Sequence, residues 1–304
     1  MRSQSLKPRG RGGRLAPVVT AFACLLLLPG AALAAGTLDR VKQSGTITLG
    51  YRADARPFSY RDESGSPAGY SVALCGKIAE ELKAKVIFVQ VSVEDRFTAL
   101  QQGKIDLLCD PATETLARRS AVAFSIPVLA SGTGALVRRD APARLKEVLA
   151  GRKVSGPIWR GSAYQILEKR VFTVVGGTTG ERWVRERRDE LGLNVGVTPV
   201  KDYTTGLQRV IERDSDALFG DRAILLDAAK RSPLAGDLAV VDRYFTRETV
   251  ALALQRGDED FRLFVDRALS QLFRSKDIGP LYETYFGKPD QSALNFFALT
   301  ALPE

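Results

Sequence analysis

The 304-residue chain contains no histidine, and only three cysteines and one methionine. The absence of histidine excludes Ser-His-Asp and Cys-His catalytic systems and every His-ligated metal site. Chemistry is left to carboxylates, lysine, tyrosine and cysteine, which weakens most interpretations of the chain as an enzyme. Hydrophobic residues make up 45% of the chain and charged residues 26%. It can therefore bury a sizeable core, as one large or two ordinary domains.

The net charge of +9 is concentrated at the N-terminus. Five basic residues precede the first acidic one, Asp39: Arg2, Lys7, Arg9, Arg11 and Arg14. Apolar residues 15–33 follow and end in Ala32-Leu33-Ala34, which is the order of a secretory signal peptide. We expect cleavage after Ala34 and a periplasmic location. An uncleaved membrane anchor is the alternative, which Pro29 and Gly30 disfavour by interrupting the apolar stretch.

Without residues 1–34 the chain is ordinary in charge. Five of the 44 basic residues and none of the 35 acidic ones are removed, which leaves a net charge of +4. We therefore expect no nucleic-acid partner and no stable membrane insertion after cleavage. Two cysteines remain, Cys75 and Cys109. In an oxidising compartment they are candidates for a disulfide, and two separate buried thiols are the alternative.

From Thr46 onward, short β-rich runs alternate with helical patterns, which predicts α/β layering. The first series has strands at 47–51, 86–91 and 105–109 and helices at 71–83 and 95–102. In the first of these helices Val72, Cys75 and Ile78 recur at spacings of three, so this face packs on the sheet. Cys109 ends a strand of the same sheet, so the two cysteines are predicted to meet.

A second series repeats the first and predicts a second, similar lobe. Its strands lie at 171–175, 197–200 and 217–219, and its helices begin at 178, 203 and 221. A last strand at 250–254 and helices at 258–273 and 277–286 return to the first lobe, so the chain crosses twice and forms a hinge. We place the signal peptide at 1–34, lobe 1 at 37–138 plus 246–286, lobe 2 at 139–245 with an insertion at about 155–170, and a C-terminal tail at 287–304.

Two connections between a strand and a helix are candidate anion sites. In the first, Thr113 and Arg118 are either a helix N-cap and a surface cation, or two donors for a carboxylate. In the second, Thr178 and Glu181 satisfy a capping box, while Gly176 and Gly177 would also let an anion approach the helix closely. The Lys-Ser/Thr ending of a phosphate loop is missing.

Three further charged residues stand at predicted strand ends or helix starts. Asp221 follows strand 217–219 at its carboxyl end, where α/β folds place ligands. It is a candidate for binding an amine, and an N-cap for the next helix is the alternative. Arg52 follows strand 47–51 and Arg96 opens a helix, so both are placed at the corresponding edge of lobe 1. Taken singly, each arginine is an ordinary surface residue.

Seven motifs follow one another along most of the chain: Gly50-Tyr51-Arg52, Pro57-Phe58-Ser59-Tyr60, Gly69-Tyr70-Ser71, Arg96-x-x-x-Leu100-x-x-Gly103-x-x-Asp106, Thr113-x-x-x-x-Arg118, Gly177-Thr178-Thr179 and Asp216-Ala217-x-x-x-Asp221. Together they resemble the family 3 solute-binding proteins, which are the extracytoplasmic amino-acid receptors of ABC importers. The resemblance runs from about Thr37 to Gly287. It implies an α/β, two-lobed periplasmic-binding-protein fold of type II, each lobe a sheet flanked by helices, with a two-crossing hinge.

Within that family the chain is most similar to the glutamate/aspartate-binding branch. The similarity implies that Arg52 and Arg96 receive the side-chain carboxylate of the ligand and that Arg118 binds its α-carboxylate. Asp221 then binds the α-ammonium group. Supporting contacts are assigned to Thr113, Thr178 and Tyr203.

Some positions depart from that branch. Tyr203 stands where the branch usually has histidine, and Pro111 and Ala112 replace small polar residues. These contacts lie near the side chain and amine of the ligand, so they bear on which amino acid is bound rather than on the class of ligand.

The resemblance implies an extracytoplasmic protein that captures an amino acid, glutamate or aspartate as the first choice, and delivers it to an ABC permease. We expect a monomer that needs no cofactor and no metal and is not an enzyme. Two alternatives stay open. One is an exported enzyme on the same scaffold, similar to cyclohexadienyl dehydratase, with a carboxylate or lysine as general acid. The other is a non-transporting amino-acid sensor.

Overall fold

The computed structural model describes residues 36–154 and 163–304. The predicted signal peptide and residues 155–162 of the predicted insertion lie outside these ranges. The described chain forms two separate five-stranded sheets, in the strand orders β5-β1-β6-β13-β7 and β10-β9-β11-β8-β12. It thus forms two α/β lobes, as the two series of strands and helices predict.

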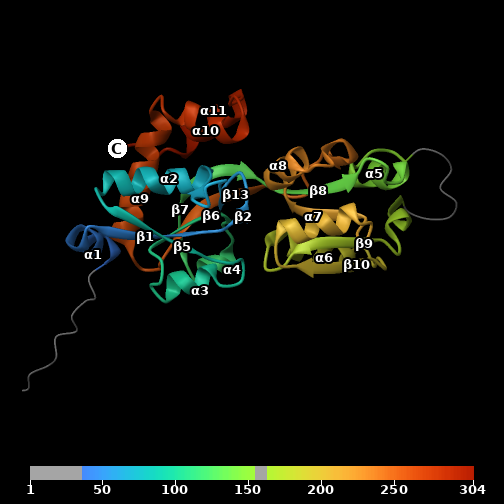
Figure 1. The fold of residues 1–304 in the computed structure, drawn as a ribbon, viewed down its shortest axis with the longest axis horizontal. Helices are drawn as coiled ribbons and strands as arrows, with labels where there is room; N and C mark the ends of the chain where they lie inside the picture. Colours follow the sequence, from blue (N-terminus) through green and yellow to red (C-terminus); the bar gives the residue numbers. More distant parts are fainter. Residues whose placement is uncertain (1–35, 155–162) are drawn as a thin grey trace, which may run out of the picture. The chain divides into compact units, whose positions relative to one another are not determined.

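The first sheet is covered by helices on both faces (Figure 1). Its strands are β1 (Thr46–Tyr51), β5 (Lys85–Gln90), β6 (Leu107–Thr113), β7 (Ala123–Ser131) and β13 (Glu248–Leu254). Helices α2 (Tyr70–Glu81) and α9 (Glu259–Arg274) cover one face, and α3 (Arg96–Gln101) covers the other. The remaining elements of this lobe are α1 (Thr37–Ser44), α4 (Leu116–Arg119) and the small sheet of β2 (Asp54–Ala55), β3 (Ser59–Arg61) and β4 (Pro67–Ala68).

Strand β6 is buried on both faces, as a central strand must be. Leu107 and Cys109 belong to the core under α2 and α9, whereas Leu108 and Ala112 belong to the core under α3. Because successive side chains of a strand alternate, Asp110 faces the side of α3. This placement brings a carboxylate beside Arg96, the first residue of α3.

The second sheet is likewise sandwiched between helices. Its strands are β8 (Thr133–Arg138), β9 (Val171–Val175), β10 (Gly196–Val200), β11 (Ala217–Asp221) and β12 (Leu238–Val240). Helices α7 (Tyr203–Ile211) and α8 (Arg222–Arg231) pack on one face, and α6 (Thr179–Glu190) packs on the other beside α5 (Ala143–Leu149). Two short 3-10 helices complete the lobe, η1 (Ala163–Leu167), within the predicted insertion, and η2 (Ala235–Asp237).

One strand lies on the other side of the predicted lobe boundary. A boundary after residue 138 places Thr133–Arg138 in lobe 1, but this strand, β8, pairs antiparallel with β11 and β12 of the second sheet. The first crossing therefore falls at Gly132, directly after β7. Strands β7 and β8 are separated by that single residue and both are apolar, so their composition does not reveal the change of sheet.

The two lobes share a device that anchors neighbouring strands. Asp106 accepts a hydrogen bond from the backbone N–H of Thr48 at 2.8 Å and pairs with Arg40. Asp216 accepts one from the N–H of Val171 at 2.9 Å and pairs with Arg170 at 3.0 Å. Asp106 and Asp216, which both belong to the sequence motifs, thus hold equivalent structural positions in the two lobes.

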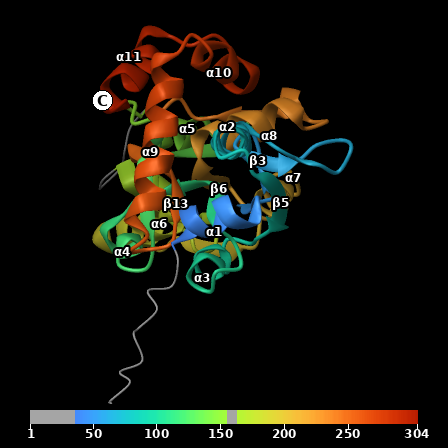
Figure 2. The same cartoon turned by 90° about the vertical axis from the view of Figure 1, so that its left-hand side faces the viewer.

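The predicted C-terminal tail contains a packed helix, α11 (Gln291–Thr300). Figure 2 shows it beside α9 and α10 (Ile278–Phe286). Phe297 is buried, and its ring centroid lies 5.2 Å from that of Phe273 and 5.8 Å from that of Tyr282. Across residues 36–154 and 163–304, no helix combines the length and apolar composition needed to cross a bilayer.

Candidate functional site

One cavity lies where the two lobes meet. It is lined by all seven residues that the sequence assigns to the ligand: Arg52, Arg96, Thr113, Arg118, Thr178, Tyr203 and Asp221. The first four come from the first lobe and the last three from the second. The space available to the centres of water molecules is about 40 Å³. At roughly 10–15 Å³ for each water this holds about three, which is less room than an amino acid needs.

A larger hollow of about 930 Å³ lies beside this cavity, between α11 and the strands near the hinge. It shares Thr113, Thr179 and Glu248 with the smaller cavity. We place the site in the smaller cavity because all seven assigned residues line it, whereas Thr113 alone of the seven lines the larger hollow.

Arg118 spans the junction between the lobes. It lies in α4, whose N-cap is Thr115, and the Thr115 hydroxyl accepts from the Arg118 N–H at 3.1 Å. The alternative that makes Thr113 the N-cap is therefore wrong, because β6 continues to Thr113. The Arg118 guanidinium donates to the carbonyl oxygens of Thr113 at 2.8 Å and of Gly177, in the other lobe, at 3.2 Å. Burial and the neighbouring Arg96 lower the pKa of Arg118 to about 10, which leaves it cationic at neutral pH.

Thr178 both caps a helix and lines the cavity. Its hydroxyl accepts from the Glu181 N–H at 3.2 Å, and the Glu181 carboxylate accepts from the Gly177 N–H at 2.9 Å. The capping interpretation therefore holds, and it does not compete with a place at the cavity. The next residue, Thr179, donates to Glu248 at 2.8 Å and lies 3.5 Å from the Thr113 hydroxyl.

Asp221 is the acidic group of the second lobe at the cavity. It is the N-cap of α8, where its Oδ1 accepts from the N–H groups of Ala223 at 2.9 Å and Ile224 at 3.3 Å. Its Oδ2 accepts from the Ser131 hydroxyl at 2.6 Å. Burial raises the pKa of the Asp221 carboxyl to about 6, against the opposing effect of these hydrogen bonds. The group is therefore mainly ionised at neutral pH and can still accept an ammonium group.

Tyr203 holds the backbone at Asp221. Its hydroxyl accepts from the Asp221 N–H at 3.1 Å, and burial raises the pKa of that hydroxyl. A side chain at position 220 would place a Cβ atom 2.5 Å from Cε1 of the Tyr203 ring. Gly220 is thus what allows the ring to reach the strand end.

Arg52 and Arg96 face the cavity with their charges already paired. Arg52 forms a two-pronged ion pair with Asp54, with Nε–Oδ1 at 3.0 Å and Nη2–Oδ2 at 2.7 Å. Asp110 lies between the two arginines, 3.7 Å from Nη1 of Arg52 and 3.1 Å from Nη1 of Arg96. Burial tends to lower the pKa of Arg52, but Asp110 and Asp54 outweigh it and the pKa is raised.

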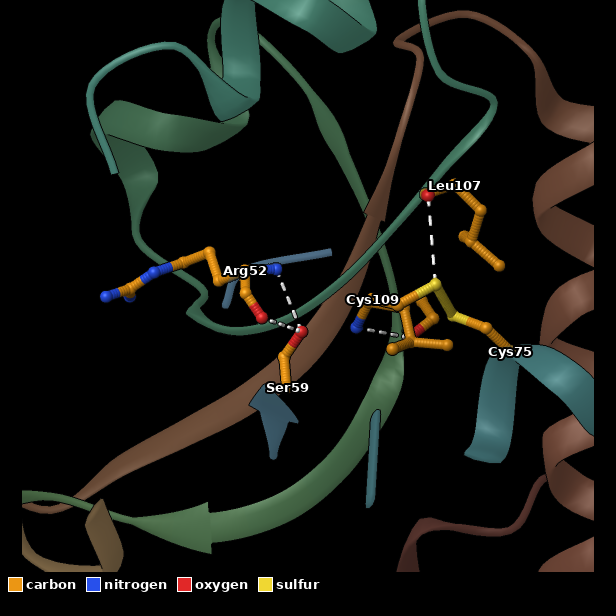
Figure 3. The surroundings of a disulfide bond; sticks show 7 residues. Arg52, Ser59, Cys75, Leu107 and Cys109 are labelled. Carbon is orange, nitrogen blue, oxygen red and sulfur yellow. Dashed lines mark hydrogen bonds between the residues drawn. A yellow bond between two sulfur atoms is a disulfide. The ribbon is translucent and has the colours of Figure 1, made fainter. Parts of the chain in front are cut away.

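A disulfide anchors the strand that carries Asp110. Cys75 of α2 and Cys109 of β6 are bonded, with Cα atoms 6.1 Å apart, which is the pairing suggested by the sequence. Figure 3 shows the Arg52 guanidinium pointing away from this bond. The backbone of Arg52 is held by Ser59, whose hydroxyl accepts from the Arg52 N–H at 2.9 Å and donates to the Arg52 carbonyl oxygen at 3.0 Å.

Sequence reasoning missed four groups around the cavity: Asp54, Asp110, Ser131 and Glu248. Asp54 and Asp110 carry a weak signal, since one follows Arg52 by two residues and the other ends the buried part of a strand. Ser131 and Glu248 carry none, because only the meeting of β7 and β13 with the second lobe brings them to the site.

Comparison with known proteins shows which family has a similar sequence. Residues 47–288 match the family described as bacterial extracellular solute-binding proteins, family 3. An L-glutamate/L-aspartate-binding protein of Pseudomonas aeruginosa is 26% identical over 288 residues, which cover 91% of this chain and 89% of the relative. A cyclohexadienyl dehydratase of the same species is 28% identical over 257 residues, which cover 83% and 87%.

Among solved structures, the ancestral amino acid-binding protein AncCDT-1, a precursor of cyclohexadienyl dehydratase, matches with a TM-score of 0.70. It is 28% identical, and the match covers 83% of this chain and 100% of that one. These matches confirm the resemblance predicted from the motifs. They also confirm the two-lobed α/β fold of the type II periplasmic amino-acid-binding proteins.

Proposed function

Because the chain belongs to the family 3 bacterial extracellular solute-binding proteins, we propose that it captures one amino acid between its lobes and delivers it to the permease of an ABC importer. One observation carries this proposal. Arg118 of the first lobe and Asp221 of the second line a single cavity, so the two charges of an amino-acid zwitterion would each meet an opposite charge.

The cavity supplies partners for both ends of that zwitterion. The planar guanidinium of Arg118 suits a carboxylate, and Thr113 adds a hydroxyl to the same cavity. The Thr178 hydroxyl lines the cavity too, but it already donates to the carbonyl oxygen of Val175 at 2.7 Å. The ionised carboxyl of Asp221 suits the α-ammonium group. With the ligand bridging the lobes, no covalent step and no cofactor is needed.

Ligand capture is coupled to closure of the hinge. A ligand that contacts both lobes gains its full set of contacts only when they are closed, so its differential affinity shifts the population toward the closed form. The closed form is then the shape that the permease recognises. A receptor that signals instead of transporting would use the same binding step.

Glutamate or aspartate is the ligand that the sequence resemblance favours, with Arg52 and Arg96 on the side-chain carboxylate. Both guanidinium groups already pair with carboxylates in this structure. The finer assignment therefore requires those ion pairs to rearrange.

Native mass spectrometry of protein released gently from the cell envelope tests the proposal. We expect a complex whose added mass equals one amino acid. N-terminal sequencing of the same sample tests export, for which we expect a start near residue 35. A retained Met1 would contradict processing, and an added mass that fits no amino acid would contradict the proposed ligand class.

An exported dehydratase is the second candidate function. It is favoured by the cyclohexadienyl dehydratase relative and by Asp221, a cavity carboxyl whose pKa of about 6 suits a general acid. A turnover assay on prephenate and arogenate separates the two functions. The binding proposal predicts no product from either compound, whereas turnover that is lost in Asp221→Asn would establish the enzyme.

A further inference from the structure

We propose that the cavity selects amino acids with an uncharged, hydrogen-bonding side chain, because Asp54 and Asp110 already neutralise the two arginines at its side-chain end. This inference rests on the proposed function and specifies its ligand. It takes Arg118 and Asp221 as the partners of the α-carboxylate and α-ammonium groups. Arg52 and Arg96 then remain for the side chain.

The pairing of Arg52 is nearly complete. Its side chain is only 3% exposed, and three of its nitrogen atoms face carboxylate oxygens of Asp54 or Asp110. The fork formed with Asp54 is the geometry in which a guanidinium binds a carboxylate most strongly. A ligand carboxylate would have to displace one that is part of the protein.

Asp110 lies between the two arginines. It is fully buried, and its two oxygens face Arg52 and Arg96 respectively. Neither oxygen has a hydrogen-bond partner within the described residues, so these two cations are its compensation for burial. A rotation of β6 that moved Asp110 away from the arginines is opposed by the disulfide, which ties the preceding residue, Cys109, to α2.

The charges around the cavity leave no place for another carboxylate. Three guanidinium groups, those of Arg52, Arg96 and Arg118, meet four acidic side chains, so acidic groups already outnumber basic ones: Asp54, Asp110, Asp221 and Glu248. An amino acid with an uncharged side chain adds no net charge. Glutamate or aspartate would add a negative charge within a few ångströms of Asp110, where burial strengthens repulsion between like charges.

Donors nevertheless remain at this end of the cavity. A guanidinium carries five N–H bonds, and among residues 36–154 and 163–304 the ion pair of Arg96 involves only its Nη1 atom. The free donors suit a neutral acceptor, such as an amide carbonyl or a hydroxyl. A cationic side chain offers only donors and would meet the N–H donors of the two arginines, so the same geometry disfavours lysine and arginine as ligands.

Calorimetric titration with matched amino acids tests the inference. The ligands are glutamine against glutamate and asparagine against aspartate, with serine and arginine in addition. We expect an uncharged member to bind at least tenfold more tightly than its acidic counterpart. In Asp110→Asn, which keeps the shape of the side chain but frees the charge of Arg96, we expect the ratio to shift at least tenfold toward the acidic ligand.

Two further variants make the test independent of how Asp110→Asn folds. Asp54→Asn removes the partner of Arg52 at a position that is 23% exposed, and it should shift the ratio in the same direction. Asp140→Asn is the matched control, because this exposed carboxylate pairs with Arg138 and Arg213 away from the cavity. It should leave the ratio unchanged.

The possible outcomes separate this inference from the proposed function. Tighter binding of glutamate than of glutamine by the unmodified protein overturns the inference but leaves amino-acid capture standing. The same holds for an unchanged ratio in folded Asp110→Asn and Asp54→Asn. Failure of all twenty amino acids to bind overturns the proposed function, and the inference with it.

Discussion

Asp221 shows how one side chain serves both fold and site. One of its oxygens caps α8 and the other accepts from Ser131, yet the carboxyl also lines the cavity. A carboxylate has about four lone-pair positions, so capping leaves capacity for an ammonium group. The two interpretations of this residue from sequence are therefore compatible.

The raised pKa of Asp221 predicts that amino-acid affinity falls in mild acid. If only the ionised form binds, the apparent dissociation constant grows as that form is depleted, and with a pKa of about 6 it rises roughly tenfold at pH 5. Titrations at pH 7.5 and pH 5 measure this change. Asp221→Asn should bind weakly at both pH values, and equal affinity of the unmodified protein at both would contradict the role of Asp221.

The same raised pKa makes the stability of the fold respond to pH in the opposite direction from ligand affinity. The folded-state pKa of Asp221 lies above its ordinary value of 3.8, so the folded protein holds this proton more tightly than the unfolded chain. The stability that this group contributes is fully present below the ordinary pKa and is lost as the pH rises through about 6. Ligand affinity and this contribution to stability thus respond oppositely to acid.

At the residue level, the sequence predicts which side chains gather but not how they are paired. The seven assigned residues line one cavity because they lie at strand ends, or in the connections and first helical turns nearby, in both lobes. Asp110 was not among them because its effect depends on β6 lying next to β1, which brings it beside Arg52. Pairings across a sheet are not readable from local spacing.

At the level of elements, β6 connects the disulfide to the site. Cys109 is followed at once by Asp110, and the same strand ends at Thr113. The helix that carries Cys75 was predictable because its apolar spacing is regular. That β8 belongs to the second lobe was not predictable, because β7 and β8 are both apolar and only Gly132 separates them.

Removal of the disulfide should lower the free energy of unfolding. The bond joins residues 34 positions apart, and opening a loop of this length costs about 2–4 kcal/mol. Urea unfolding of the Cys75→Ala, Cys109→Ala double variant measures the loss. The unmodified protein in excess thiol should approach the same midpoint, and a variant as stable as the oxidised protein would refute the role of the bond.

Two glycines should respond to alanine in opposite directions. At Gly132, where the chain changes lobes, a Cβ would lie 2.0 Å from the carbonyl oxygen of Thr246 in the other crossing. Gly132→Ala should therefore cost about 1–3 kcal/mol of stability, as forced overpacking does. At Gly76, inside α2, a Cβ meets nothing within 4 Å. Gly76→Ala should stabilise by about 0.5–1 kcal/mol.

Thermal melts of both variants check this pair of predictions. A stable Gly132→Ala would mean that the two crossings are not as closely packed as the structure shows. A destabilised Gly76→Ala would mean that α2 is limited by something other than the flexibility of glycine.

On the scale of the whole molecule, a few polar contacts already connect the lobes. Arg56 pairs with Asp227 at 3.3 Å, and Arg118 donates to the carbonyl of Gly177. The two crossings are themselves bonded, since the Thr133 N–H donates to the Thr246 hydroxyl at 2.9 Å. An amino acid bound between Arg118 and Asp221 would add a further link, and by the proposed function this link stabilises the closed form.

The general architecture was predictable from the sequence because the strand and helix series repeats. The enclosed cavity was not, because its size depends on how the two lobes meet. Helix α11 was not predicted either. It lies beyond the last family motif, so the sequence analysis assigned residues 287–304 to a tail.

Calorimetric titration of Arg118 variants measures whether Arg118 binds the α-carboxylate of the ligand. Arg118→Ala should lose about 2–5 kcal/mol of binding free energy for the cognate amino acid, because a buried carboxylate is left unpaired. Arg118→Lys should also bind more weakly, since an ammonium group lacks the planar fork. Arg119→Ala, at the exposed neighbouring position, should bind as the unmodified protein does. Unchanged affinity in Arg118→Ala would contradict the site itself.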